Sequence, residues 1–436
     1  MRVMARRMLA AAVSMTAAAS LVTAASAATA AEKSTELRKI GTFHTTTTGE
    51  QQEPTRVEMA SIGEKCTPIT SSPAAARAGA VKECVTVRAK EDAAPRSEED
   101  SSLRLAAATD AACQPGSWTY ERFGSCMSDT RVTYTLRDDK GTALGTGSLD
   151  IDSSMSLDAR STTWTEQITV TMTGATGAVT HLHVAFDAGC TSACSMANAS
   201  PWLGLKTFAV GTTATGTVSY TETLASGAVD YLTTNYHMYV TTTGAVPTEP
   251  NVNWSNPRKV RCDNAVHQAG SGTPGCVYPD VTPDLSFSIG QYGAAAITYG
   301  WALNNLPNMP HSFKRLSDAT GQNANRARTC GSQSSVPFIP FDDSVVYQDS
   351  CDEFPFAGTY EGGTDGGLCA EIVPQYENGQ WFVYQADDNR PVTGQEPCVR
   401  GHVPSGDNSA AGGKYGSFVQ SQRVIDTEKF TVSITN

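Results

Sequence analysis

The chain has 436 residues, which is more than one domain of typical size, so several folded parts are expected. Its net charge of −12 counts against a protein that binds nucleic acid tightly, because such binding rests on Lys and Arg contacts to phosphates. Its twelve cysteines, an even number, favour disulfide bonds if the chain leaves the reducing cytosol.

The first 27 residues have the pattern of a secretory signal peptide. Arg2, Arg6 and Arg7 form a basic start, residues 8–23 are apolar and rich in Ala, and residues 25–27 (Ala-Ser-Ala) make a small-x-small cleavage site. The apolar run is too short for a membrane anchor, and no later segment has the apolar length to span a bilayer. We therefore expect a secreted, extracellular protein without a membrane span.

Cysteine spacing in an exported chain predicts a set of local disulfides. Proximity alone does not fix connectivity. A zinc site is a poor alternative, because only Cys190 and Cys194 are spaced closely enough and no second pair follows. The expected pairs are Cys66–Cys84, Cys113–Cys126, Cys190–Cys194, Cys262–Cys276, Cys330–Cys351 and Cys369–Cys398.

Residues 28–110 predict a disordered leader or linker. The runs 45–48 and 93–100 are polar or charged and lack aromatic residues, so they bury too little apolar surface to offset chain entropy. A small hairpin is expected only around the Cys66–Cys84 pair and the run 81–87. A plain exported linker is the simpler interpretation, and a propeptide or wall-spanning linker is the functional alternative.

Residues 111–260 predict a central all-β, sandwich-like module. Apolar and Thr residues alternate with period two around 132–136, 168–173, 218–220 and 236–240, which is typical of strands with one buried face. Short strands at such spacing, separated by Gly-rich turns, favour a β-sandwich. As an accessory domain it would contact the cell wall, a glycan or another partner, or serve as a spacer.

His181-Leu182-His183 lies within this module. On a strand both imidazoles point to one face, which allows a metal pair. No third ligand is evident in the sequence, so an ordinary exposed strand face is the simpler interpretation.

Residues 275–436 predict a third part of mixed α and β structure. A helix is expected over 294–306, where Pro307 stops it, and strands are expected around 381–384 and 430–434. Between them, Asp352, Glu353 and Glu361 lie within ten positions among aromatic residues, a proline and a glycine pair. Carboxylates in such a setting are what a divalent-metal site or an acid/base pair requires.

Three ordered motifs in this part carry a family resemblance. They are residues 351–357 (Cys-Asp-Glu-Phe-Pro-Phe-Ala) followed by Glu361-Gly362, residues 325–330 (Asn-Arg-Ala-Arg-Thr-Cys), and residues 407–413 (Asp-Asn-Ser-Ala-Ala-Gly-Gly). Together they resemble the NucA/NucB family of secreted bacterial deoxyribonucleases over roughly the last third of the chain. The resemblance implies an α+β nuclease domain over 275–436 that hydrolyses DNA phosphodiester bonds with a divalent cation, Mg²⁺ or Mn²⁺.

The resemblance also implies roles for the acidic residues. Asp352 would activate the attacking water as a general base or through a bound metal, and Glu361 would be a metal ligand. Asn408 would be a neutral oxygen ligand or would orient the substrate. Glu353 would assist, although neighbours on a strand point to opposite faces, so it would not face the phosphate together with Asp352. Ala411 replaces the family's common glutamine, so no ligand is assigned there.

Basic residues are the expected substrate contacts. Arg315 or Arg326 would clamp the phosphate, although surface Arg residues are the default interpretation of such a segment. From residue 276 onward there are nine Lys and Arg residues against eighteen Asp and Glu residues, so DNA would be bound weakly and without sequence preference. Residues 399–402 (Val-Arg-Gly-His) echo the Asp-Arg-Gly-His motif of ββα-metal nucleases. We interpret this echo as coincidence, with His402 as an alternative base.

Two function hypotheses follow. The first is a secreted, metal-dependent, non-specific endonuclease acting on DNA. The second is a non-catalytic secreted β-rich binding or cell-surface protein that retains an inactive nuclease fold.

Overall fold

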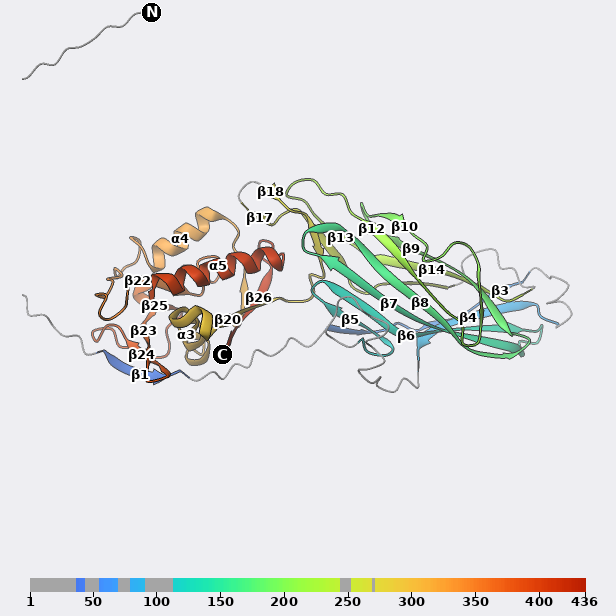
Figure 1. The fold of residues 1–436 in the computed structure, drawn as a ribbon, viewed down its shortest axis with the longest axis horizontal. Coiled ribbons are helices and arrows are strands. Elements are labelled where there is room, and N and C mark those ends of the chain that lie inside the picture. The colour runs from blue at the N-terminus through green and yellow to red at the C-terminus, as the bar shows by residue number, and fades with distance from the viewer. Residues whose placement is uncertain (1–36, 44–54, 70–78, 91–112, 244–251, 269–270) are drawn as a thin grey trace, which may run out of the picture. The chain divides into compact units, whose positions relative to one another are not determined.

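The computed structural model describes residues 37–43, 55–69, 79–90, 113–243, 252–268 and 271–436. This described part is mostly β-structure, arranged in several sheets, with three α-helices (Figure 1). The expected signal peptide (1–27) and the polar runs 45–48 and 93–100 lie outside it. No helix among the described residues has both the length and the apolar character needed to cross a membrane.

The largest sheet has nine strands and contains the Thr-rich alternation seen in the sequence. Its long strands β6, β7 and β8 are antiparallel neighbours in which buried and partly exposed residues alternate. The strands run in the order β10-β12-β8-β7-β6-β4-β3, and β5 pairs with β6 and β2. Their bounds are β2 Thr55–Glu58, β3 Ile62–Pro68, β4 Lys82–Ala89, β5 Ser117–Glu121, β6 Gly124–Arg137, β7 Ala143–Asp158, β8 Ser161–Gly177, β10 Ser195–Asn198 and β12 Thr213–Thr221.

A four-stranded sheet shares its core with the nine-stranded sheet. Ile151 and Val170 from the larger sheet, and Val184 and Met238 from the smaller, belong to one buried cluster. The all-β expectation for this part of the chain is confirmed at the level of its strands. The four-stranded order is β11 (Lys206–Ala209), β9 (His181–Cys190), β14 (Thr234–Thr241) and β15 (Val252–Ser255); smaller sheets contain β13 (Val229–Leu232), β16 (Val260–Asp263) and β19 (Gly275–Val277), and β17 (His267–Gln268) with β18 (Ser271–Gly272).

Part of the expected leader is folded, which corrects the prediction for 28–110. Strands β2 to β4 join the nine-stranded sheet, and β3 and β4 form the expected hairpin with the Cys66–Cys84 disulfide. Strand β1 (Arg38–Thr42) pairs with β24, which lies more than 300 residues later in the chain. The local sequence of these segments resembles a linker, because the strands that they pair with are distant in the chain.

The C-terminal part contains a five-stranded sheet and a three-stranded sheet. The first has the order β1-β24-β23-β25-β22, and the second has the order β20-β26-β21. Helices α3 and α5 contact each other, and both contact β22 and β25 (Figure 1). The bounds are β20 Asp284–Ser288, α3 Ile289–Asn305, β21 Ser312–Lys314, α4 Ala319–Thr329, β22 Asp349–Phe354, a 3₁₀ turn Gly366–Leu368, β23 Ala370–Glu377, β24 Gln380–Gln385, β25 Val399–Pro404, α5 Ser405–Ser421 and β26 Lys429–Thr435.

Local chemistry explains where α4 begins and ends. The Asp318 side chain accepts hydrogen bonds from the backbone N–H groups of Thr320 and Gly321, which have no partner within the helix. Arg326 and Arg328 lie in the last turn, where positive charge complements the helix dipole. The glycine-rich run 407–413 forms part of α5, although glycine has a low helix propensity.

All six cysteine pairs expected from proximity are disulfides in the structure. Cys330–Cys351 and Cys369–Cys398 lie in the C-terminal part, and the other four lie among the β-rich segments.

A carboxyl group is buried inside the β-rich core. Glu166 on β8 is fully buried and accepts hydrogen bonds from the hydroxyls of Tyr220 (2.8 Å) and Tyr236 (2.9 Å). Burial raises the pKa of Glu166 to about 7, although the two tyrosine hydrogen bonds oppose the shift. The carboxyl group therefore titrates near neutral pH in the folded protein.

We predict that Glu166→Gln removes a pH-dependent loss of stability. The folded-state pKa is raised, so the wild type is most stable below about pH 4.5 and loses on the order of 3 kcal/mol as the pH rises toward 7. Urea unfolding at pH 4.5 and pH 8 measures the effect, with the exposed Glu58→Gln as the matched control. Identical pH profiles for wild type and Glu166→Gln would contradict it.

Candidate active site

Asp352 and Glu353, here called the acidic pair, lie on β22. Their side chains point to opposite faces of the strand, as strand periodicity predicts. Asp352 is only 5% exposed, and its Oδ2 accepts a hydrogen bond of 2.7 Å from the Tyr299 hydroxyl on α3. Glu353 is half-buried on the other face, where its Oε2 lies 3.5 Å from Cys330 Sγ. The two carboxyl groups therefore have different surroundings although they are adjacent in sequence.

Burial dominates the electrostatics of Asp352. It raises the pKa of this carboxyl well above its usual range, and the neighbouring charge of Glu353 raises it further. The Tyr299 hydrogen bond lowers the pKa in part, because a donor stabilises the carboxylate form. Tyr299 thus favours the ionised form of Asp352 in part, and nothing in the sequence marks it for that role.

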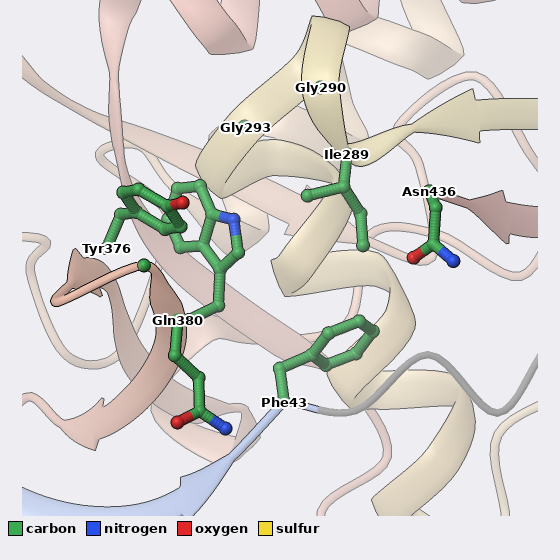
Figure 2. Close-up of a pocket in the computed structure, with 9 residues that line it drawn as sticks. Phe43, Ile289, Gly290, Gly293, Tyr376, Gln380 and Asn436 are labelled. Carbon is green, nitrogen blue, oxygen red and sulfur yellow. The ribbon is translucent and has the colours of Figure 1, made fainter.

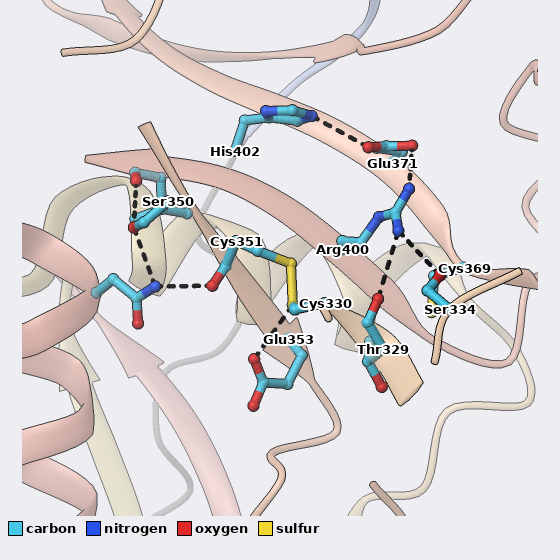
Figure 3. Close-up of a disulfide and its surroundings, with 12 residues drawn as sticks. Thr329, Cys330, Ser334, Ser350, Cys351, Glu353, Cys369, Glu371, Arg400 and His402 are labelled. Carbon is cyan, nitrogen blue, oxygen red and sulfur yellow. Dashed lines mark hydrogen bonds and ion pairs between the residues drawn. A yellow bond between two sulfur atoms is a disulfide. The ribbon is translucent and has the colours of Figure 1, made fainter. Parts of the chain in front are cut away.

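Glu353 lies near a positive charge. Burial raises the pKa of its carboxyl, and Arg326 on α4 lowers it in part. Arg326 itself is exposed, and its Nη1 donates to Asn323 Oδ1 at 3.2 Å. The Cys330–Cys351 disulfide joins the residue after α4 to β22 and so brings these two groups into the same neighbourhood (Figure 3).

Asn408 on α5 contacts the same strand. Its Nδ2 donates to Cys351 O at 2.9 Å and to Ser350 Oγ at 3.1 Å. The amide N–H groups of Asn408 therefore face β22, and its Oδ1 is the side-chain atom that could bind a ligand. Asn408 is thus held against the strand that carries Asp352 and Glu353.

The preceding residue anchors α5. Asp407 Oδ2 accepts a hydrogen bond of 2.9 Å from the backbone N–H of Ala294, next to a kink in α3. The kink residue Gly293 has φ of 43°, and a Cβ at this position would lie 2.2 Å from Asp407 Oδ2. Glycine is required here, because a side chain would displace the carboxylate that positions the start of α5.

Two other sequence-predicted residues are placed differently. Glu361 lies beyond the strand, and its Oε2 accepts a hydrogen bond of 2.9 Å from the backbone N–H of Lys314 on β21. Arg315 is buried, and its Nη1 donates to the carbonyl oxygen of Val424. Arg315 therefore holds the backbone together, and the structure does not present it as a phosphate clamp.

A cavity of about 540 Å³ lies at the start of α3 (Figure 2). Aromatic and small residues line it, including Phe43 after β1, Tyr376 and Trp381, but neither Asp352 nor Glu361 does. A smaller cavity of about 280 Å³ also includes Tyr376 and Trp381, and Asp407 reaches it. The larger cavity therefore does not coincide with the carboxylates.

His402 belongs to a buried charged network that includes Glu371 and Arg400 (Figure 3). It is 2% exposed; its Nδ1 lies 2.6 Å from Asp349 Oδ2, and its Nε2 lies 3.2 Å from Glu371 Oε1. Glu371 Oε2 also pairs with Arg400 Nη2 at 2.8 Å. The ring of Phe338 stacks on the imidazole with centroids 4.4 Å apart. A covered imidazole of this kind braces β22, β23 and β25.

The two carboxylates decide the ionisation of His402. Burial lowers its pKa, but the hydrogen bonds and charges of Asp349 and Glu371 raise it more, so the net shift is upward from 6.5. No pattern in the sequence indicated these partners, because they are remote from residue 402 in the chain.

We predict that His402→Asn costs more stability at acidic than at alkaline pH. Since the folded-state pKa of His402 is raised, its ion pairs stabilise the fold fully below about pH 6.5 and lose that contribution as the pH rises through the folded-state pKa. Urea midpoints at pH 5.5 and pH 9.5 measure the difference between wild type and variant. The exposed His237→Asn is the control, and an equal difference at both pH values would refute the prediction.

The donor set limits how a divalent cation can bind. Within the described ranges, the only group of three close His, Cys, Asp or Glu residues is Glu64 with Cys66 and Cys84, whose sulfurs form a disulfide. The candidate site therefore does not supply a complete set of protein ligands for a cation. Carboxylate and amide oxygens still fit a Mg²⁺-like ion, because such ions are held by one or two carboxylates and keep several waters.

Comparisons with known proteins point to the same segment. The family model described as Deoxyribonuclease NucA/NucB matches residues 300–383, which contain Asp352, Glu353 and Glu361. No curated protein matches the chain. Among solved structures, the native conformation of E. coli alpha-2-macroglobulin matches with 10% identity and a TM-score of 0.18, over 40% of this chain and 11% of that chain. That likeness is too low to carry an argument, whereas the family match confirms that the C-terminal part of the chain is similar to the NucA/NucB deoxyribonucleases.

Proposed function

We propose that the chain is a secreted, non-specific endonuclease that hydrolyses DNA phosphodiester bonds and requires a divalent cation. The family match over residues 300–383 carries this proposal, because the acidic pair of β22 lies inside it. The contacts of Arg326 and Asn408 with the surroundings of that strand support it.

Arg326 is the proposed phosphate contact. It is exposed at the end of α4, whereas Arg315 is buried and bonded to backbone. Lys314 on β21 and Arg328 on α4 are also exposed, so a few positive side chains are available within an acidic region. A few contacts of this kind support weak, sequence-independent binding of DNA.

Asp352 is the proposed general base. Its carboxyl must be ionised to accept a proton from water, but burial favours the neutral form. The Tyr299 hydroxyl supports the ionised form by donating to Oδ2. The rate of DNA hydrolysis should therefore rise with pH in the acidic range, as Asp352 ionises. Glu353, with Arg326 nearby, should support the site from the opposite face of the strand.

Glu361, Asp352 and Asn408 are the residues that would hold the cation, with Mg²⁺ or Mn²⁺ the expected ions. A bound cation would neutralise charge on the phosphate and lower the pKa of a bound water. The chain would supply carboxylate oxygens from β22 and from the loop after it, and an amide oxygen from α5. Waters would complete the coordination.

The proposed organisation is a β-rich accessory domain over 111–260 and a nuclease domain over 275–436, after a signal peptide. Strand β1 adds residues 38–42 to the nuclease sheet.

The alternative is a secreted binding protein with an inactive nuclease fold. The buried position of Asp352 and the lack of three clustered ligands among the described side chains favour it over a preassembled metal enzyme. Activity with added cations separates the two functions.

We predict that the purified protein converts supercoiled plasmid to nicked plasmid with Mg²⁺ or Mn²⁺, and that EDTA stops the reaction. Asp352→Asn and Glu361→Gln should each slow nicking by roughly a hundredfold or more, because they remove the proposed base and the proposed ligand. The exposed Asp388→Asn is the matched control and should retain wild-type rates.

Two outcomes would count against this mechanism. Nicking that persists in EDTA, or in both carboxylate variants, would contradict the metal-carboxylate mechanism. No nicking with any divalent cation, by a protein with native circular dichroism, would support the binding protein instead.

A further inference from the structure

Two histidines on β9 form a pair in the β-rich part of the chain, remote in sequence from the candidate active site. His181 and His183 are two residues apart on the strand, so their side chains share one face, whereas Leu182 and Val184 are fully buried on the other. Both imidazoles are half-buried. Strands β11 and β14 flank β9 and hold the pair in a fixed register.

The two rings turn the same nitrogen toward one point. His181 Nε2 lies 2.6 Å from Thr243 Oγ1, and His183 Nε2 lies 3.0 Å from the same oxygen. The ring centroids are 5.3 Å apart, and the rings are nearly perpendicular at 80°. Two imidazole nitrogens therefore converge on a single polar atom at the end of β14.

The other nitrogen of each ring has its own partner. His181 Nδ1 lies 2.9 Å from Thr180 Oγ1, and His183 Nδ1 lies 2.9 Å from Thr207 Oγ1. Metal-bound histidines commonly donate their second ring N–H to an oxygen, which fixes the tautomer and the ring orientation. When both Nδ1 atoms carry protons, two Nε2 lone pairs face Thr243, whose single hydroxyl proton can satisfy only one of them.

We propose that His181 and His183 bind a divalent transition-metal ion of the zinc and copper type through their Nε2 atoms. The ion would replace the two hydrogen bonds to Thr243, and this hydroxyl or water would complete the coordination. Imidazole nitrogen suits Zn²⁺, Cu²⁺ and Ni²⁺, whereas Mg²⁺ and Mn²⁺ favour carboxylate oxygen. The site is therefore distinct in sequence position and in chemistry from the proposed nuclease site.

Metal binding to tag-free protein tests the proposal. Equilibrium dialysis with Zn²⁺ should find a site that His181→Asn and His183→Asn each weaken by at least about tenfold, since a single imidazole remains. With Cu²⁺, the electron paramagnetic resonance spectrum should show coupling to two ring nitrogens, reduced to one in either variant.

The matched control is His237→Asn. His237 lies on the adjacent strand β14, is exposed, and bonds to Asn253 and Asn235 rather than to a second imidazole. Its variant should bind Zn²⁺ as the wild type does. Zn²⁺ binding that is absent from the wild type, or unchanged when both His181 and His183 are replaced, would overturn the proposal without bearing on DNA cleavage.

Discussion

The Cys330–Cys351 disulfide is the constraint on which the candidate active site depends. It joins the end of α4 to β22 across 21 residues, so Arg326 and Glu353 come from distant segments into one neighbourhood. Closing a loop of this size stabilises a fold by on the order of 3 kcal/mol, chiefly by restricting the unfolded chain. The disulfide therefore favours the arrangement in which the exposed guanidinium of Arg326 lies near Glu353 on β22.

The faces of β22 have different polar surroundings, and both matter for the site. On one face Asp352 lies against Tyr299 in an apolar core, where its charged form is unfavourable. At the start of the strand, Asp349 holds the buried His402 together with Glu371 from β23. Buried ionic networks are costly to break because one partner is left without its counter-charge. The network around His402 therefore holds β22 in place, although the same strand carries Asp352, whose charged form is disfavoured by burial.

Local patterns in the sequence predicted much of this structure, whereas long-range contacts could not be predicted. The six disulfides, the alternating strands and the opposite orientations of Asp352 and Glu353 follow from spacing and periodicity. The pairing of β1 with β24 and the partners of His402 depend on chain segments far apart in sequence. Helix α5 was missed because glycines disfavour helices, and the burial of Arg315 could not be read from composition.

The most direct test of this account is the plasmid-nicking rate of the double variant Cys330→Ser with Cys351→Ser. If the disulfide positions Arg326 against the acidic strand, the rate should fall by at least about tenfold, because small displacements of catalytic groups are costly. Replacing Cys190 and Cys194, which are joined in the β-rich part, should leave the rate unchanged. Equal rates for all three proteins would contradict the account.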